Sequence, residues 1–177
     1  KFGPLLAAAA KLKVGSALID GEAVVLEDNG CSNFQALQNA IKASPDDTYA
    51  ALATIDGLSR WWTSDTRGKS EVGKVIDFRF GNRGFIDTRV IELVPDTRVL
   101  WEVIDGPEAW SGTQILFELY RQDEHTIVLF KHRGWAEAIE FMHHCSTKWA
   151  TFLLSLRAAL ETGTGAPFPY GIHVSNK

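Results

Sequence analysis

The sequence predicts an α+β fold, in which a curved antiparallel sheet wraps around one long C-terminal helix and two short helices lie near the start. Three observations lead to this fold class. Residues 140–163 contain the longest uninterrupted helical pattern in the chain. Between residues 76 and 132, apolar residues recur with a period of two in several short segments. The turns between these segments are short, which implies an antiparallel meander because parallel strands need long crossovers.

The long helix is predicted from an apolar stripe that repeats at three- and four-residue steps. Its members are Met142, Cys145, Trp149, Phe152, Leu153, Leu156 and Leu160, whereas Lys148, Ser155 and Arg157 are expected to lie off the stripe. Gly163 can adopt the left-handed conformation that ends a helix. At about 1.5 Å per residue the helix would be roughly 35 Å long, so it needs a large concave partner.

The two short helices and the strands follow from caps, turns and alternation. Ser44 can cap a helix that starts at Pro45. Leu58, Trp61 and Trp62 predict a second short helix that ends in two indoles. Polar loops are expected at residues 64–73 and 105–112, and strands at residues 76–80, 85–94, 99–104, 115–119 and 127–132.

Length and composition exclude several classes of protein. The chain has 177 residues, of which 45% are hydrophobic, so it can bury a core as one domain with a short appendage. Its formal net charge of -4 and its lack of a basic run argue against a nucleic-acid-binding surface. No apolar run approaches the ~20 residues that cross a bilayer, so no membrane span is expected. The two cysteines, Cys31 and Cys145, indicate no disulfide framework, which makes a cytoplasmic location the default.

Residues 1–43 differ in pattern from the rest of the chain. Residues 16–30, SALIDGEAVVLEDNG, suggest two short strands followed by an Asn-Gly turn. Phe34, Leu37 and Ile41 then have the spacing of one helical face, although Ile41 equally suits the start of a strand.

The same stretch carries a first resemblance. ALIDGEAVVLEDNG followed by SNFQALQNAI, within residues 11–42, resembles the middle of the adenylation domain of bacterial ATP-dependent DNA ligases. The resemblance implies that Asp20, Gly21 and Glu22 correspond to an acidic strand beside the nucleotide and its metal. That family also needs a nucleophilic lysine followed by an Asp-Gly pair, and no lysine here stands in that setting, so no phosphoramidate can form. We therefore interpret residues 1–43 as a ligase-like fragment without ligase activity, an N-terminal appendage to a domain covering residues 44–177.

A second resemblance covers residues 41–165. It rests on SPDDTYAALATIDGLSRWWT, the VGKVIDFRFG strand, RVLWEV, WSGTQILFEL and HRGW, followed by FMHHCSTKWATFLLSLRAALETG. This ordered series resembles the START-like, or polyketide-cyclase-like, superfamily (SRPBCC), and within it the branch homologous to the activator of the Hsp90 chaperone ATPase. The resemblance implies a helix-grip fold with a tunnel between sheet and helix. In that family a first strand precedes the Ser-Pro helix start. Either residues near Asn39 to Ala43 form a truncated first strand, which is the preferred interpretation, or the strand is replaced from elsewhere.

The candidate site consists of aromatic and histidine side chains that could line such a tunnel. These ligand-binding candidates are Trp61, Trp62, Phe78, Phe80, Phe85, Trp101, Phe117, Phe130, His132, Trp135, Phe141, His144, Trp149 and Phe152. An aromatic-rich tunnel with few polar groups suits a flat apolar or amphipathic ligand. The alternative is that these rings simply fill a core.

Charged strand residues could orient a ligand only if they face inward. Arg89 with Glu102 could form a buried pair, but a solvated outer face is the preferred interpretation for Arg89. For His132 the sequence does not decide between the inner and the outer face of the sheet.

The run His143, His144 and Cys145 predicts neither a metal site nor a nucleophile. Consecutive helix residues diverge by about 100°, whereas helical ligand pairs prefer three- or four-residue steps. The same divergence prevents Cys145 and a neighbouring histidine from pointing at one reacting atom. We expect no catalytic residue, no metal and no cofactor.

Three hypotheses of function follow. The leading one is a module that binds a small apolar or planar ligand in the tunnel without chemistry. The second is a domain that binds a protein partner or regulates a chaperone. The third is an enzyme, either cyclase-like or a ligase relic.

Overall fold

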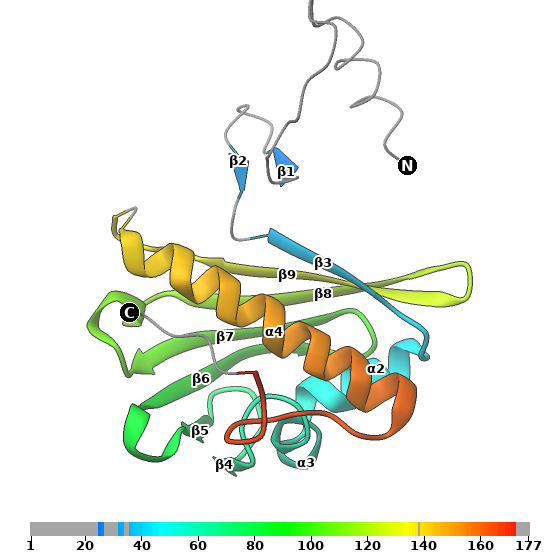
Figure 1. Ribbon diagram of the computed structural model, residues 1–177, viewed down its shortest axis with the longest axis horizontal. Coiled ribbons are helices and arrows are strands. Elements are labelled where there is room, and N and C mark those ends of the chain that lie inside the picture. The colour runs from blue at the N-terminus through cyan, green and yellow to red at the C-terminus, as the bar shows by residue number, and fades with distance from the viewer. Residues whose placement is uncertain (1–24, 27–31, 34–35, 138, 173–177) are drawn as a thin grey trace, which may run out of the picture.

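The computed structural model describes residues 25–26, 32–33, 36–137 and 139–172 of the 177-residue chain. Within them, seven antiparallel strands form one sheet, and helix α4 (Glu140–Thr162) lies diagonally across one of its faces (Figure 1). The short helices α2 (Pro45–Ala53) and α3 (Ile55–Ser59) lie near the C-terminal end of α4. This arrangement confirms the predicted α+β, helix-grip class.

The sheet has the strand order β3-β9-β8-β7-β6-β5-β4, so each strand from β4 to β9 lies beside the next one along the chain. The strands are β3 (Ala36–Ile41), β4 (Asp65–Gly68), β5 (Val75–Arg79), β6 (Phe85–Val94), β7 (Arg98–Asp105), β8 (Gln114–Gln122) and β9 (His125–Arg133). Two 3-10 turns, η1 (Gly81–Arg83) and η2 (Glu108–Trp110), precede β6 and β8. A separate two-stranded sheet joins β1 (Val25–Leu26) to β2 (Ser32–Asn33).

Side-chain caps start the two short helices, as the sequence predicts for the first. Ser44 Oγ accepts a hydrogen bond of 3.0 Å from the backbone N–H of Asp47 at the start of α2. Thr54 Oγ1 accepts one of 3.0 Å from the N–H of Gly57 at the start of α3. Each cap satisfies one of the N–H groups that a helix start leaves without an internal partner.

Helix α4 confirms the predicted range and its stop. Gly163 at the C-cap has a φ of 79°, the left-handed conformation expected there. Four residues of the predicted stripe are buried, namely Cys145, Trp149, Leu153 and Leu156. The placement of Ser155 off the stripe was wrong, because only 6% of its surface is exposed and its hydroxyl accepts a hydrogen bond of 2.8 Å from the N–H of Ala166.

After α4 the chain folds back over the molecule as residues 164–170, which we call the C-terminal strap. Phe168 in the strap forms a parallel bridge with Thr63. Its N–H donates to the carbonyl of Trp62 (2.9 Å), and its carbonyl accepts from the N–H of Ser64 (3.0 Å). In Figure 1 the strap passes between α3 and α4. It therefore fixes an aromatic side chain beside the start of β4.

Strand β3 overturns one expectation and bears out another. The helical face predicted at Phe34, Leu37 and Ile41 is wrong for Leu37 and Ile41, because β3 pairs with β9 along all its residues, from Ala36 opposite Lys131 to Ile41 opposite Thr126. Phe34 lies outside the described residues. Ladder pairing of this kind outweighs local helical spacing. The expected truncated first strand is present, a few residues earlier than predicted.

Strand β4 was missed, because residues 64–73 were predicted as a polar loop. Its sequence DTRG carries no apolar alternation, and Thr66 is its buried residue, 8% exposed. The Thr66 hydroxyl donates to the carbonyl of Thr63 (2.7 Å), so hydrogen bonding rather than apolar burial fixes the strand. It pairs with β5 at the edge of the sheet.

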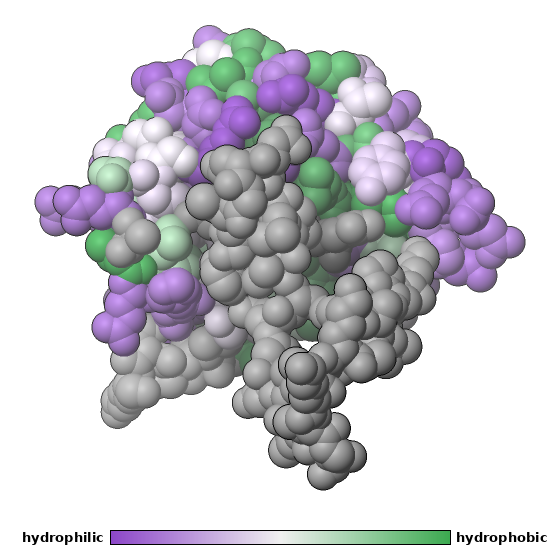
Figure 2. Space-filling model, turned by 90° about the horizontal axis from the view of Figure 1, so that it is seen from above, coloured by the Kyte–Doolittle hydropathy of each residue, from purple (hydrophilic) through white to green (hydrophobic). Residues whose placement is uncertain are grey.

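The ligase-like residues Asp20, Gly21 and Glu22 lie outside the described residues. The predicted domain boundary at residue 43 stays a prediction, although β3 lies before it and belongs to the seven-stranded sheet. Among the described helices, none is long and apolar enough to cross a membrane. On the face shown in Figure 2, polar and apolar side chains of the described residues are interspersed.

Candidate ligand-binding site

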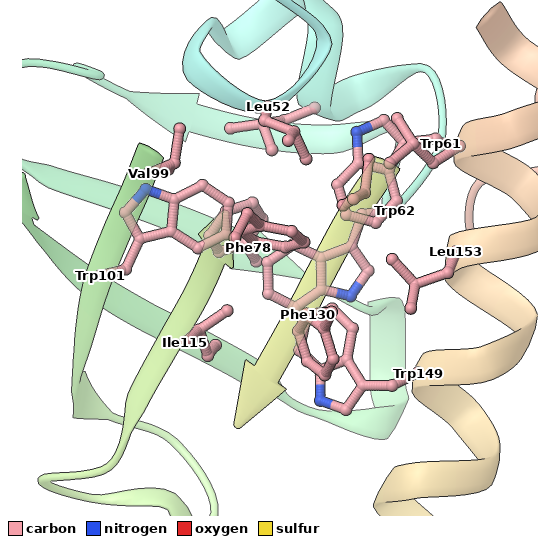
Figure 3. Packing of buried hydrophobic residues seen from close by; sticks show 14 of the residues in the cluster. Leu52, Trp61, Trp62, Phe78, Val99, Trp101, Ile115, Phe130, Trp149 and Leu153 are labelled. Carbon is pink, nitrogen blue, oxygen red and sulfur yellow. The ribbon is translucent and has the colours of Figure 1, made fainter. Parts of the chain in front are cut away.

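The space between the sheet and α4 is filled by aromatic rings that contact one another (Figure 3). The ring centroid of Trp62 lies 4.0 Å from that of Phe78, 4.8 Å from that of Trp149 and 6.0 Å from that of Trp101, on which it stacks. The rings of Phe130 and Trp149 have centroids 4.5 Å apart. These are the distances of packed aromatic pairs. The middle of the predicted tunnel is therefore occupied by the rings themselves.

The structure brings most of the predicted site residues into this one core. Those with at most 2% of their surface exposed are Trp61, Trp62, Phe78, Trp101, Phe117, Phe130, His132 and Trp149. Those at its border, partly buried, are Phe80, Trp135, Phe141, His144 and Phe152.

Phe85 does not join the other predicted site residues. It is 39% exposed, and the guanidinium carbon of Arg79 lies 5.1 Å from its ring centroid. The next residue, Ile86, is 6% exposed, so β6 turns Ile86 inward and Phe85 outward. The alternation of apolar residues in the sequence did not show whether Phe85 or Ile86 faces the core.

His132 on β9 forms the main polar connection inside the core. Thr113 Oγ1 donates to the carbonyl of Trp110 (2.6 Å) and lies 2.8 Å from His132 Nε2. The indole Nε1 of Trp149 donates to His132 Nδ1 (3.3 Å). Because the only hydroxyl proton of Thr113 is already donated, these partners assign the proton of a neutral imidazole to Nε2.

Burial holds His132 in this neutral state. It lowers the pKa of His132 from 6.5 to about 3, since the charged form loses its solvation. A proton on Nδ1 would also face the indole N–H of Trp149, which is itself a donor. The imidazole therefore acts as a fixed hydrogen-bonding bridge between β9 and α4.

Trp110 in η2 is a core residue that sequence reasoning missed. It is 7% exposed, its ring centroid lies 4.5 Å from that of His132, and it stacks on Trp149 at 6.0 Å. Its position within the loop predicted at residues 105–112 concealed this role. A large aromatic residue inside a polar loop was the available signal.

Cys145 on α4 is held as a protonated thiol. Its Sγ accepts a hydrogen bond of 3.3 Å from the indole Nε1 of Trp110. Burial raises the pKa of Cys145 to about 11, and a thiol in this state is a weak nucleophile. Within the described ranges, no group of three or more His, Cys, Asp or Glu residues could hold a metal ion.

Two polar atoms on the inner face of the sheet have no hydrogen-bond partner among the described residues. They are the indole Nε1 of Trp101 on β7 and the hydroxyl of Thr88 on β6, and both residues are fully buried. Buried polar atoms usually have a partner, which can be an ordered water or a bound molecule. They are the two places in the core where a small polar group would gain a hydrogen bond.

At the border of the core, three phenylalanines from separate parts of the chain meet, and we call this cluster the aromatic margin. Phe80 follows β5, Phe152 lies on α4 and Phe168 lies on the strap. The ring centroid of Phe80 is 6.5 Å from that of Phe152 and 5.6 Å from that of Phe168. All three are partly exposed, and Trp62 lies behind them, 6.1 Å from Phe80.

Two basic side chains accompany the aromatic margin. The guanidinium carbon of Arg83 in η1 lies 5.6 Å from the ring centroid of Phe168. Lys148 lies one helical turn before Phe152 and is partly buried. Burial lowers the pKa of Lys148, Cys145 opposes this shift, and the positive charge of Arg83 adds to it. The margin is thus apolar with positive charge at its side.

The outer face of the sheet carries ion pairs. Arg89 Nη1 and the Glu102 carboxylate lie 3.0 Å apart, with 48% and 34% of their side chains exposed. The predicted pair therefore exists, on the solvated face that was preferred for Arg89.

A separate groove of about 410 Å³ lies between α2, α3 and the end of α4. Its walls include Asp47, Ala50, Thr54, Arg60 and Leu160. None of the predicted site residues lines it, and its small side chains offer little to hold a flat ligand.

Comparisons with known proteins agree with this fold. Residues 42–161 match the family described as "Activator of Hsp90 ATPase homolog 1-like protein". Among solved structures, the chain is similar to that of the Aha1 dimer from Colwellia psychrerythraea, with 48% sequence identity and a TM-score of 0.68, over 73% of this chain and 97% of that chain. A comparison with curated proteins gave no match.

More distant structures share the fold alone. Protein SSP2350 from Staphylococcus saprophyticus is 14% identical, with a TM-score of 0.62 over 74% of this chain and 93% of that chain. Protein EF2215 from Enterococcus faecalis is 19% identical, with a TM-score of 0.61 over 83% of this chain and 81% of that chain. Nothing in these comparisons supports the ligase resemblance of residues 11–42, which stays a prediction.

Proposed function

The chain belongs to the family of Activator of Hsp90 ATPase homolog 1-like proteins, in the SRPBCC superfamily, and on this premise we propose that its helix-grip domain binds a small, flat, mostly apolar molecule without transforming it. The binding site that we propose is the aromatic margin. The observation that carries the proposal is the convergence of Phe80, Phe152 and Phe168 from three elements at a place where the rings are partly exposed.

The packing of the core favours a ligand site at the aromatic margin over one in the middle of the core. A ligand between Trp62 and Phe78 would have to separate rings whose centroids are 4.0 Å apart. At the margin, a flat molecule can cover Phe80 and Phe152 without breaking such a contact. Ligand sites are usually lined by apolar and aromatic side chains with a few polar groups, which fits this cluster and its basic neighbours.

The chemistry of the nearby titratable groups supports binding over catalysis. The raised pKa of Cys145 keeps its thiol protonated at neutral pH, and the lowered pKa of His132 keeps its imidazole neutral. Both nitrogens of His132 are already engaged by Thr113 and Trp149. Neither group is placed to act as a nucleophile or a general base.

The test is a titration with N-phenyl-1-naphthylamine, a neutral flat probe whose fluorescence rises when it leaves water. We expect saturable binding that Phe152→Ala weakens roughly tenfold, because that substitution removes one wall of the margin. Leu154→Ala is the matched control, since Leu154 lies on the same helix but is 57% exposed. Saturable binding that is equally strong in Phe152→Ala, or no saturable binding to the unmodified protein, contradicts the proposal.

We also propose a second function, the binding of a protein partner of the Hsp90 chaperone class. The family description and the 48% identical relative named Aha1 favour it. Because that relative was solved as a dimer, self-association is part of the same proposal.

The ATPase rate of an Hsp90-class chaperone, measured with increasing amounts of this protein, tests the second function. A saturable change in rate would support it. An unchanged rate, together with no complex in sedimentation velocity at the same concentrations, would count against it. Sedimentation of the protein alone gives its oligomeric state.

A further inference from the structure

Lys148 is placed unusually for a lysine. It lies on the side of α4 that also carries Phe152, with part of its surface buried. Lysines are mostly exposed, because removing the ammonium group from water costs free energy unless a partner replaces the lost solvation. Lys69 and Lys74, by contrast, are exposed.

Lys148 differs from several other basic residues in its ion pairing. Among the described residues, no Asp or Glu forms an ion pair with Lys148, whereas Lys131 pairs with Glu118 at 3.0 Å and Arg157 with Glu161 at 3.0 Å. Arg83, which is also positive, disfavours the ammonium form, whereas Cys145, one helical turn before Lys148, acts in the opposite direction. Burial together with a like charge makes the ammonium form of Lys148 less favourable, as the direction of its pKa shift indicates.

The chain has a formal net charge of -4, so an overall excess of basic residues does not explain why Lys148 and Arg83 lie near each other. The Arg83 guanidinium carbon lies 5.6 Å from the ring centroid of Phe168, and Lys148 lies one helical turn before Phe152 on α4. An anion bound beside them would offset both the desolvation of Lys148 and its repulsion by Arg83.

We infer that Lys148, with Arg83 beside it, binds the carboxylate of a ligand whose flat apolar part covers the aromatic margin. The ligand class is therefore a planar, mostly apolar carboxylic acid. The ammonium group of Lys148 donates hydrogen bonds to the carboxylate, and the rings of Phe80, Phe152 and Phe168 contact the apolar part. This inference rests on the proposed binding of a flat ligand and adds the charge of that ligand.

Calorimetric titration with 2-naphthoate and with 2-naphthamide tests the inference, because the two compounds have the same shape and differ in charge. We expect the unmodified protein to bind the acid at least about tenfold more tightly than the amide, as charge-assisted hydrogen bonds are stronger than neutral ones. Lys148→Gln should abolish this preference by weakening binding of the acid much more than binding of the amide. Lys148→Arg should retain it.

Lys74→Gln is the matched control, since it changes the net charge equally at an exposed lysine. A preference for the acid that survives in Lys148→Gln, or that Lys74→Gln removes equally well, overturns the inference. Equal affinity of the unmodified protein for acid and amide also overturns it, but leaves the proposed function in place. Failure of both compounds while N-phenyl-1-naphthylamine still binds contradicts the inference alone, whereas failure of all three probes contradicts the proposed function as well.

Discussion

At the scale of single residues, Trp149 connects α4 to the rest of the molecule in two ways. Its ring contacts Trp62, Phe130 and Trp110, and its indole N–H is donated to His132. One side chain thus combines a large buried apolar area with a buried hydrogen bond. Both contributions are lost together when the side chain is truncated.

Trp149→Ala should therefore lower the free energy of unfolding by about 3–5 kcal/mol, the range for removing a large aromatic residue from a packed core. Urea denaturation measures this change. Leu154→Ala on the exposed side of α4 should change it by less than about 0.5 kcal/mol. A loss below about 1 kcal/mol for Trp149→Ala would show that the sheet does not grip α4 as described.

His132 predicts a dependence of stability on pH. Its folded pKa of about 3 lies below its unfolded value of 6.5, so unfolding takes up a proton at pH values between them. The contribution of the neutral imidazole is fully present above pH 6.5 and is lost as the pH falls toward 3. Between pH 7.5 and pH 5 the loss should be about 2 kcal/mol.

The free energy of unfolding of the unmodified protein and of His132→Gln, measured by urea denaturation across this pH range, checks the prediction. His132→Gln should flatten the slope, whatever its own stability. His144, whose pKa burial also lowers, remains in both proteins and cancels in the comparison. Two parallel pH profiles would show that His132 is not the group responsible.

At the scale of elements, loss of the short strand β3 should lower the free energy of unfolding by a large amount relative to its length. Its six residues pair with β9, Ile41 is fully buried, and the amide of Asn39 donates to the carbonyl of Leu153 in α4 (2.7 Å). The strand therefore contacts both layers of the fold. It closes one edge of the sheet, so that removing it would leave β9 without a neighbour on that side.

A variant lacking residues 1–43 should be at least about 3 kcal/mol less stable than one lacking residues 1–35, because it loses a strand ladder and the buried Ile41 side chain. Chemical denaturation of the two shortened proteins gives the difference. Equal stability of the two would place the start of the folded domain after β3, at the boundary predicted from the sequence.

Elements with a strong periodic signal were predictable, and those fixed by long-range contacts were not. The stripe from Cys145 to Leu156 and the stop at Gly163 gave α4 within a residue or two. Strands β5 to β9 followed from alternation and short turns. β3 has helical spacing and is a strand because β9 is available to pair with it. β4 has almost no apolar residues and is fixed by its edge position beside β5.

The sequence predicted which residues belong to the candidate site better than it predicted how they are arranged. Alternation placed aromatic residues such as Phe78 and Trp101 on strands, which made them candidates, and both are fully buried. Alternation cannot tell which face is inward, which explains Phe85, and it cannot tell whether rings line a space or fill it. Phe168 and Trp110 were missed because they lie in segments without periodicity, and only the fold brings Phe168 to the border of the core and Trp110 into it.

At the scale of the whole molecule, the packed centre and the open border divide the interior into two parts. The centre around Trp62 and Trp149 holds the sheet and α4 together. The border at Phe80, Phe152 and Phe168 keeps partly exposed rings next to Lys148 and Arg83. We therefore attribute the stability of the fold to the first part and propose the second as the place of ligand binding.

Indole N–H signals in a ¹H–¹⁵N correlation spectrum test this division most directly, because each tryptophan reports from a known place. On titration with 2-naphthoate, the signals of Trp62 and Trp149 should shift and saturate together, since their ring centroids lie 6.4 and 6.1 Å from that of Phe152. The signal of Trp61, whose N–H is donated to the carbonyl of Ala51, should change least. Phe152→Ala should weaken the saturable shifts and Leu154→Ala should not. Shifts confined to Trp61, or no saturable shift at any indole, would contradict ligand binding at the aromatic margin.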